Sequence, residues 1–203
     1  MKSIEFKSTT NSSEKKNFDV QTKSLLVKIK SWEMENSKLK IEINEVLVDD
    51  LKGKIKTTET KSKSQSNISF LEFPLKINKI NLKNSDLEIV SKGKPMALNG
   101  LNLNINQLEL SQNNAQKLLL KSRNYNLTLR SFNTNPSQFY KISANNISVN
   151  SAKGSISNFA MTPLVSRAQF IRMIPVERDL YDLKVENILF NGSWDLLNPD
   201  KFL

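Results

Sequence analysis

Apolar and polar residues alternate along most of this chain, which is the pattern of a strand with one buried face and one wet face. Residues 101–105 (LNLNI) and 125–129 (YNLTL) are clear examples, and the first continues at Leu108 after a change of parity. Asn, Lys, Ser and Gln fill the intervening positions. The long apolar runs of a doubly covered parallel sheet are missing from the sequence. The pattern therefore predicts an all-β protein with a mostly antiparallel sheet.

Three segments depart from this alternation. Residues 166–173 (SRAQFIRM) predict one short helix, because Ser166 and Gln169 fit a capping box and Pro175 would close the segment. Residues 1–16 are polar, and we expect a disordered or frayed end there with at most one edge strand near Ile4 and Phe6. Residues 52–67 predict a solvated hairpin end or a mobile loop. Residues 17–203 then form a single repeat region.

The chain contains an internal repeat. Residues 27–41 (VKIKSWEMENSKLKI) and 75–89 (LKINKINLKNSDLEI) match at every apolar position and at an Asn-Ser pair. Residues 183–193 (LKVENILFNGS) give the same opening with Gly-Ser at the turn, and residues 147–156 are a looser copy. The repeat predicts a unit made of a strand, a short turn and a returning strand.

The spacing inside the repeat predicts a bulge. Ile77 and Ile80 have opposite parity, so a regular strand would place them on opposite faces. A bulge near Asn78-Lys79 would return both to one face and bend the strand. The first copy has the same break between Ile29 and Trp32, and the third has it between Val185 and Ile188.

The Asn-Ser pair predicts a two-residue hairpin turn in the first two copies, and residues 191–193 predict a three-residue turn in the third. Oppositely charged residues flank the first two turns, which favours cross-strand contact between them. The expected apolar pairs are Met34–Leu39, Trp32–Ile41, Leu82–Leu87, Ile80–Ile89, Phe190–Trp194 and Ile188–Leu196.

The composition argues against an enzyme. The chain has no Cys and no His, which removes thiolate nucleophiles, the commonest general base and the usual zinc ligands. The carboxylate groups Glu33/Glu35, Asp49/Asp50 and Asp86/Glu88 would suit acid–base chemistry, but we interpret them as solvent-face charges balanced by Lys. We expect no catalytic, metal or cofactor site.

The net charge of +10 raises the possibility of a nucleic-acid partner. Lys greatly outnumbers Arg, however, and Arg is the residue that base and phosphate recognition prefers. The aromatic residues do not form a stacking platform. We therefore expect no nucleic acid and interpret the charge as a solvated face. No stretch is long and apolar enough to span a membrane, and the first residues do not resemble a signal peptide, so the chain taken literally would be cytoplasmic.

The unit LKINKINLKNSDLEI, together with residues 140–164 and 182–197, resembles the strand units of AsmA-like envelope proteins, including the DUF748-like members from Bacteroidetes. The resemblance implies an elongated, twisted sheet of repeated bulged β-hairpins that curls into an open groove with an apolar inner face, without catalytic residues. It also implies a periplasmic or cell-envelope location and a membrane-associated full-length protein. Family members are longer and begin with a membrane anchor, so we expect this chain to be a fragment.

The sequence and the resemblance together predict a non-catalytic protein for lipid handling or transport, or a scaffold for outer-membrane biogenesis. Phospholipid or another acyl-chain lipid is the expected partner, and self-association through an exposed sheet edge is a further expectation. The alternative is a surface β-solenoid that acts as an adhesin or a glycan-binding module. The residues expected to line the groove are Trp32, Met34, Leu39, Ile41, Ile80, Leu82, Leu87, Ile89, Ile188 and Phe190.

Overall fold

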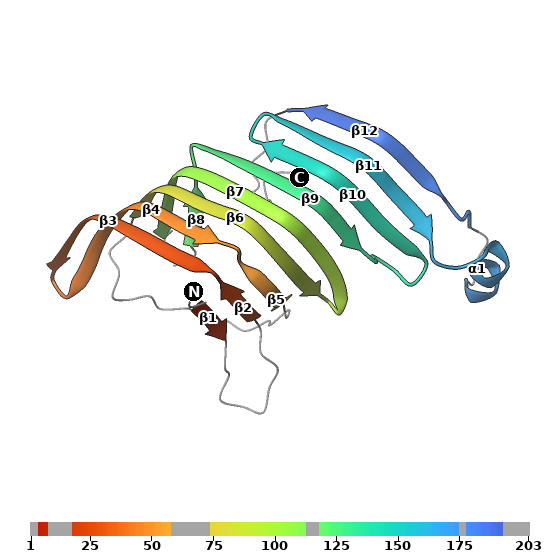
Figure 1. Cartoon of the computed structure of the whole chain (residues 1–203), viewed down its shortest axis with the longest axis horizontal. Helices are drawn as coiled ribbons and strands as arrows, with labels where there is room; N and C mark the ends of the chain where they lie inside the picture. Colours follow the sequence, from red (N-terminus) through yellow and green to blue (C-terminus); the bar gives the residue numbers. More distant parts are fainter. Residues whose placement is uncertain (1–3, 8–17, 58–73, 113–117, 175–177, 193–203) are drawn as a thin grey trace.

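The computed structural model describes residues 4–7, 18–57, 74–112, 118–174 and 178–192. Within these ranges the chain forms one sheet of twelve strands and one short helix. The predicted all-β class is confirmed: the sheet is mostly antiparallel, is not closed into a barrel and curls into an open groove. The longer strands bend along their length, so that the sheet forms an arch (Figure 1).

The strands follow one another along the chain with short connections in most places. They are β1 (Ile4–Lys7), β2 (Phe18–Thr22), β3 (Ser24–Glu35), β4 (Lys38–Asp49), β5 (Lys52–Thr57), β6 (Leu75–Ser91), β7 (Lys94–Gln112), β8 (Leu118–Lys121), β9 (Asn124–Thr134), β10 (Tyr140–Asn150), β11 (Lys153–Pro163) and β12 (Leu183–Asn191), and the helix α1 (Arg167–Met173) lies between β11 and β12.

The sheet has the order β1-β2-β5-β6-β7-β9-β10-β11-β12. Strands β2 and β3 run antiparallel to β5 and β4, so residues 18–57 make one long hairpin that is kinked between β2 and β3. Strand β6 then lies parallel to both β4 and β5, with Asp49 beside Lys83 and Lys52 beside Asp86. These two ladders are the parallel ones among the described strands.

The first hairpin is confirmed. Asn36 and Ser37 form the turn with φ of 50° and 61°, the left-handed conformation that two-residue hairpins require. Met34 lies opposite Leu39, and the flanking charges Glu35 and Lys38 face each other. Trp32 and Ile41 form the next expected pair.

The prediction of a second hairpin, with its turn at Asn84-Ser85, is wrong. Strand β6 runs through Asn84-Ser85 without turning, and the chain reverses at Lys92-Gly93 instead. The structure replaces the expected pairs by Ile80–Ile105, Leu82–Leu103, Leu87–Leu98 and Ile89–Met96, all with β7. Asn84 does adopt a positive φ of 52°, but within a bulge in the strand. The strands that pair with β6, β4 and β5 on one side and β7 on the other, hold it extended through this position.

The predicted bulges are confirmed in part. The register between β3 and β4 shifts on both sides of Ile29, where the first copy predicted a break. In the third copy β12 keeps its alignment with β11, so no bulge is seen there, although Val185 and Ile188 are both half-buried as the parity change predicted. No register shift occurs at Asn78-Lys79, because β6 keeps its alignment with both β4 and β7 there. The third-copy pairs with Trp194 and Leu196 lie outside the described residues.

Helix α1 is confirmed together with its capping box. Ser166 Oγ accepts from the Gln169 amide at 3.3 Å, and Gln169 Oε1 accepts from the Ser166 amide at 3.0 Å. One expectation for the weak segments changes, because residues 52–57 form β5 rather than a hairpin end or a loop. Residues 4–7 form the edge strand β1 that the sequence allowed near Ile4 and Phe6, and residues 8–17 and 58–67 lie outside the described residues.

Candidate functional site

The sheet has one apolar face, which we define by its cross-strand rows. One row contains an apolar residue on each of seven strands, from Leu25 on β3 to Phe190 on β12, with a single glycine on β11. Its members, in spatial order, are Leu25, Val48, Leu82, Leu103, Leu127, Val149, Gly154 and Phe190. Because strands lie about 4.8 Å apart, the row is roughly 34 Å long.

Phe190 fills the one gap in this row. A Cβ atom at Gly154 would lie 2.1 Å from Phe190 Cζ, so the phenyl ring lies directly over the glycine. An aromatic side chain that covers a glycine on the neighbouring strand restores the packing that the glycine lacks. The apolar surface therefore continues to the last described strand.

Three further rows run beside the first. One joins Val27, Val46, Ile80, Ile105 and Tyr125. Another contains Leu87, Leu98, Phe132 and Ala144. A third, on the side of the sheet nearer α1, joins Phe18, Ile55, Ile89, Met96, Thr134, Ile142, Met161 and Leu183, with Thr134 as its one polar member. These rows make the apolar face several residues wide as well as long.

Six residues in the left-handed conformation keep this face continuous. Each has φ between 46° and 62° and directly precedes a residue that points to the apolar face or into the core. They are Asp50, Asn84, Gly100, Gln107, Asn146 and Asn158. Asn84, Gly100, Asn146 and Asn158 lie where the register shifts, so the apolar pattern changes parity there without leaving the face. Asp50 lies between β4 and β5, and Gln107 lies where β6 and β7 keep their alignment. Four of the six are Asn or Gly, the types that adopt this conformation most readily.

Side-chain hydrogen bonds hold the bulges of β6 and β7. The Gly100 amide donates to Asp86 Oδ1 at 2.7 Å, and the Asn84 amide donates to Asn102 Oδ1 at 3.0 Å. Ser85, which follows Asn84, is fully buried and accepts from the Leu51 amide at 3.3 Å. The backbone groups released by the bulges therefore have partners, as buried polar groups require.

Exposure rises along the apolar face toward β3. The core clusters around Leu101 and Ile105 are buried. On β3, which pairs only with β4 among the described strands, Trp32 and Met34 are 67% and 63% exposed. Such a contiguous, uncovered apolar surface is unusual on a monomer and typically marks a binding site.

The opposite face is polar and carries the charges. Lys28 donates to Glu45 at 2.7 Å, and this hydrogen bond lowers the pKa of the Glu45 carboxyl against the opposing effect of desolvation. Lys30 lowers the pKa of Glu42 in the same way, and the bond to Asp50 raises the pKa of Lys52. These three shifts all come first from an ion pair at the surface.

Four of the six carboxylates that acid–base chemistry would need lie in ion pairs with Lys or Arg, namely Glu33, Asp50, Asp86 and Glu88. Glu33 is 2.9 Å from Lys40, and Glu88 is 2.6 Å from Lys54. Asp86 accepts from the backbone of β7 as described above. This arrangement supports our interpretation of these groups as solvent-face charges. Among the described residues, no group of carboxylates is arranged to hold a metal ion.

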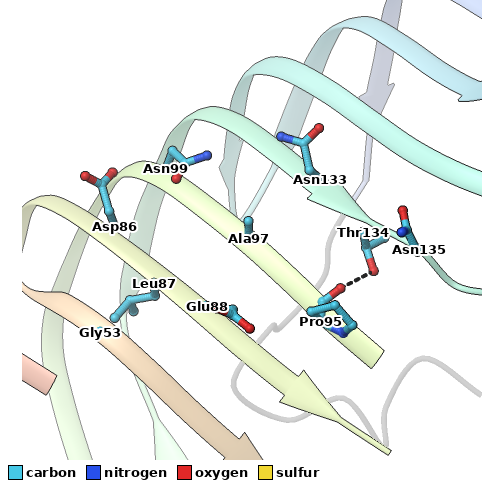
Figure 2. Close-up of a pocket in the computed structure, with 10 residues that line it drawn as sticks. All are labelled: Gly53, Asp86, Leu87, Glu88, Pro95, Ala97, Asn99, Asn133, Thr134 and Asn135. Carbon is cyan, nitrogen blue, oxygen red and sulfur yellow. Dashed lines mark hydrogen bonds between the residues drawn. The ribbon is translucent and has the colours of Figure 1, made fainter. Parts of the chain in front are cut away.

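A shallow depression of about 460 Å³ lies on the polar side of the sheet, where β6, β7 and the end of β9 meet. Figure 2 shows the side chains of Asp86, Asn99 and Asn133 pointing to the same side there. Glu88 and Asn135 complete its polar lining, and Thr134 donates to the Pro95 carbonyl at 3.0 Å. The depression offers amide and carboxylate groups to a ligand.

Five of the ten residues expected to line a groove lie in these four rows: Ile80, Leu82, Leu87, Ile89 and Phe190. The other five form apolar cross-strand pairs outside the rows, Trp32–Ile41 and Met34–Leu39 between β3 and β4, and Ile188 with Ile156 of β11. Their neighbours differ from the prediction in the second copy, as described above, and agree in the first. Sequence reasoning missed the left-handed residues and Gly154. The signal for the former was the recurring three-residue gap between apolar positions, as from Leu98 to Leu101 and from Ile105 to Leu108.

Comparison with protein-family models and with curated proteins found no match to this chain. Within the described residues, no helix has the length and apolar character needed to cross a bilayer.

Proposed function

We propose that this chain is a non-catalytic lipid-handling protein whose apolar face holds acyl chains. The observation that carries the proposal is the row of apolar residues that continues across eight strands without a charged member. A row of roughly 34 Å is comparable with the hydrocarbon thickness of a bilayer, about 30 Å. A sheet whose apolar face is open offers this surface to a ligand, whereas a closed two-sheet sandwich would cover it.

The binding would be non-covalent. Each methylene removed from water contributes about 0.8 kcal/mol, and the affinity would depend on chain length more than on the head group. The exposed end near Trp32 and Met34 would let a chain enter from the side. Charged groups lie on the opposite face, where they keep the outer surface wet.

The likeness of the repeat to AsmA-like envelope proteins supports the same proposal and adds a location. In that setting the chain would be part of a longer envelope-associated protein that moves lipid or serves as a scaffold for membrane biogenesis. The edges at β3 and β12, which carry no further strand among the described residues, would then join further strands or allow self-association.

A second candidate is a glycan-binding module, which the polar depression beside Asn99 and Asn133 favours. Amide and carboxylate side chains suit sugar hydroxyls. Its described lining contains no aromatic ring on which a sugar could stack, and for that reason we place it second.

Two neighbouring residues of β3 give a matched test. Val27 lies on the apolar face opposite Val46, and Leu26 lies on the other face opposite Leu47. They are 45% and 44% exposed, so a charge at either position should cost similar stability. We expect Val27→Asp to weaken binding of a fluorescent fatty acid and Leu26→Asp to leave it unchanged.

Native mass spectrometry of the purified chain should show copurified phospholipid, and the fatty-acid titration should saturate. Absence of bound lipid together with no fatty-acid binding would refute the proposal. Equal loss in Val27→Asp and Leu26→Asp would mean that the apolar face is not the binding surface. Binding of a glycan array ligand, lost in Asn99→Ala, would support the second candidate instead.

A further inference from the structure

The end of the sheet at α1 carries exposed apolar side chains. Ile171 and Met173 on the helix are 56% and 48% exposed, and Leu164 just before it is 47% exposed. Tyr181 and Leu183, after the helix, are 59% and 45% exposed. We call these five residues the α1 patch. Inward packing of the helix depends on Phe170, which contacts Phe139 edge-to-face with 5.0 Å between ring centres.

The α1 patch joins the apolar face. Leu183 pairs with Met161 of β11, and both residues belong to the apolar row on the side of the sheet nearer α1. A depression of about 570 Å³ opens at the same place, lined by Met161, Phe170 and Tyr181 among others. An apolar path therefore leads from the rows of the sheet to the exposed side chains of the helix.

Arginine gathers at this end of the molecule. Three of the five arginines in the chain are Arg167, Arg172 and Arg178, and all three side chains are exposed. None of them forms an ion pair with a carboxylate in the described part of the chain. Glu177, Asp179 and Asp182 follow the helix in the sequence and equal the three arginines in number, but Arg167 and Arg172 belong to a helix that has no acidic residue. The guanidinium group suits phosphate because it donates two parallel hydrogen bonds.

Strands β8 to β11 and helix α1 contain no acidic residue, whereas the neighbouring β12 carries Glu186. Between Glu109 and Glu177 the sequence contains no Asp or Glu, although the chain has 20 in all. This stretch includes β8 to β11 and α1, and it carries Lys and Arg throughout. An unbroken cationic region of this kind attracts an anionic partner and repels cationic ones.

The opposite end of the molecule differs in charge. The β3–β4 turn lies at the other end of the long axis from α1 (Figure 1). It also exposes apolar side chains, Trp32 and Met34, but Glu33 and Glu35 lie between and beside them, and Glu33 pairs with Lys40. Apolar exposure together with arginines that pair with no carboxylate among the described residues is thus a property of the α1 end.

We propose that the α1 patch docks on the surface of an anionic phospholipid membrane, with Ile171 and Met173 inserted among the acyl chains and the three arginines at the phosphates. A short apolar surface flanked by basic residues binds at the interface in this way. The proposal deepens the lipid-handling function, on which it rests for its purpose: the docked end would open the apolar rows toward the membrane.

Vesicle co-sedimentation tests the proposal. Wild-type chain should bind vesicles of phosphatidylcholine with anionic phosphatidylglycerol and bind pure phosphatidylcholine vesicles weakly. Each basic residue near such a surface is worth about 1 kcal/mol, which is roughly a fivefold change in binding. Arg172→Glu removes one attractive charge and adds a repulsive one, so it should weaken binding by roughly 25-fold. Ile171→Asp should weaken it by at least about tenfold.

Leu189→Asp is the matched control, since Leu189 is 77% exposed but lies on β12 between two residues of the apolar face, away from α1. It should bind as the wild type does. Equal binding of wild type and Ile171→Asp, or equal loss in Leu189→Asp, would overturn the docking proposal, and so would a wild type that ignores anionic vesicles.

The fatty-acid titration separates this result from the proposed function. Ile171→Asp should keep fatty-acid binding while it loses vesicle binding, and circular dichroism should confirm that it is folded. If the wild type binds vesicles but no fatty acid, the proposed function fails and the docking surface stands. If the wild type binds fatty acid but no vesicles, the docking proposal fails and the proposed function stands.

Discussion

Gly100 gives a sharp test of how the sheet is built. It has φ of +62° in the middle of β7, and its amide donates to Asp86. A Cβ atom at this position would lie 2.8 Å from Arg130 Cβ on the neighbouring strand β9. The residue after it, Leu101, belongs to the buried core. Gly100→Ala therefore challenges both the left-handed conformation and the close approach of two strands.

The magnitude follows from these two effects. The left-handed conformation costs a residue with a Cβ atom about 1 kcal/mol or somewhat more. Overpacking against a group that cannot swing away adds roughly 1–3 kcal/mol, and Arg130 Cβ is fixed to the backbone of β9. We expect Gly100→Ala to lose about 3 kcal/mol in total. For a chain of this size that lowers Tm by roughly 6–12 °C.

Gly93 provides the matched control. It has φ of +77° in the β6–β7 turn, and a Cβ atom there would meet nothing within 4 Å. Gly93→Ala carries only the conformational cost, so its Tm should fall by about 2–4 °C. Thermal unfolding followed by circular dichroism measures both. Equal falls in the two variants would refute the claim that the strands approach closely at Gly100.

Two further predictions concern the apolar row and the polar face. Phe190→Ala and Gly154→Val should each destabilise the chain. In a double-mutant cycle their combination should recover about 1 kcal/mol or more of folding free energy, because the valine fills the place of the ring. Additive losses of stability would contradict this. Glu45→Gln should lower Tm near neutral pH, since Lys28 holds the pKa of Glu45 down in the folded state. That stabilisation is present above the unfolded pKa and is lost as the pH falls through the folded one, so the two Tm values should converge below about pH 4.

The first repeat could be predicted in detail because its contacts are local. The strands on either side of Asn36-Ser37 pair with each other, so the residues near the turn decide the register. Asn accepts the positive φ that the turn needs. The oppositely charged pair Glu35 and Lys38 then lies across the strands, as the sequence predicted.

The second repeat could not be predicted because two different structures satisfy the same pattern. Apolar residues five positions apart, such as Leu82 and Leu87, can face each other across a two-residue turn. They can also lie on one face of a single strand when a left-handed residue changes the parity between them. Asn84 can adopt the positive φ that either structure needs. The decision comes from distant partners, β4 and β5 on one side and β7 on the other, which the local sequence does not contain.

The candidate site also has one part that the sequence could predict and one part that it could not. Each of the ten predicted groove residues could be placed on an apolar face from alternation alone. Their arrangement into rows could not, because a row depends on seven registers at once. Gly154 had no signal of its own, since its role appears only when Phe190 on another strand covers it.

The left-handed residues connect the sequence pattern to the proposed function. A long strand with strict alternation keeps one face apolar only if it stays regular, whereas β7 changes parity twice, at Gly100 and Gln107. The bulge at Gly100 bends the strand, and at both positions the next apolar residue, Leu101 or Leu108, returns to the core. Bending and continuity are thus produced by the same residues. If Gly100 and its counterparts were replaced by regular strand residues, the sheet would flatten and its apolar rows would be broken, and with them the surface that we propose for acyl chains.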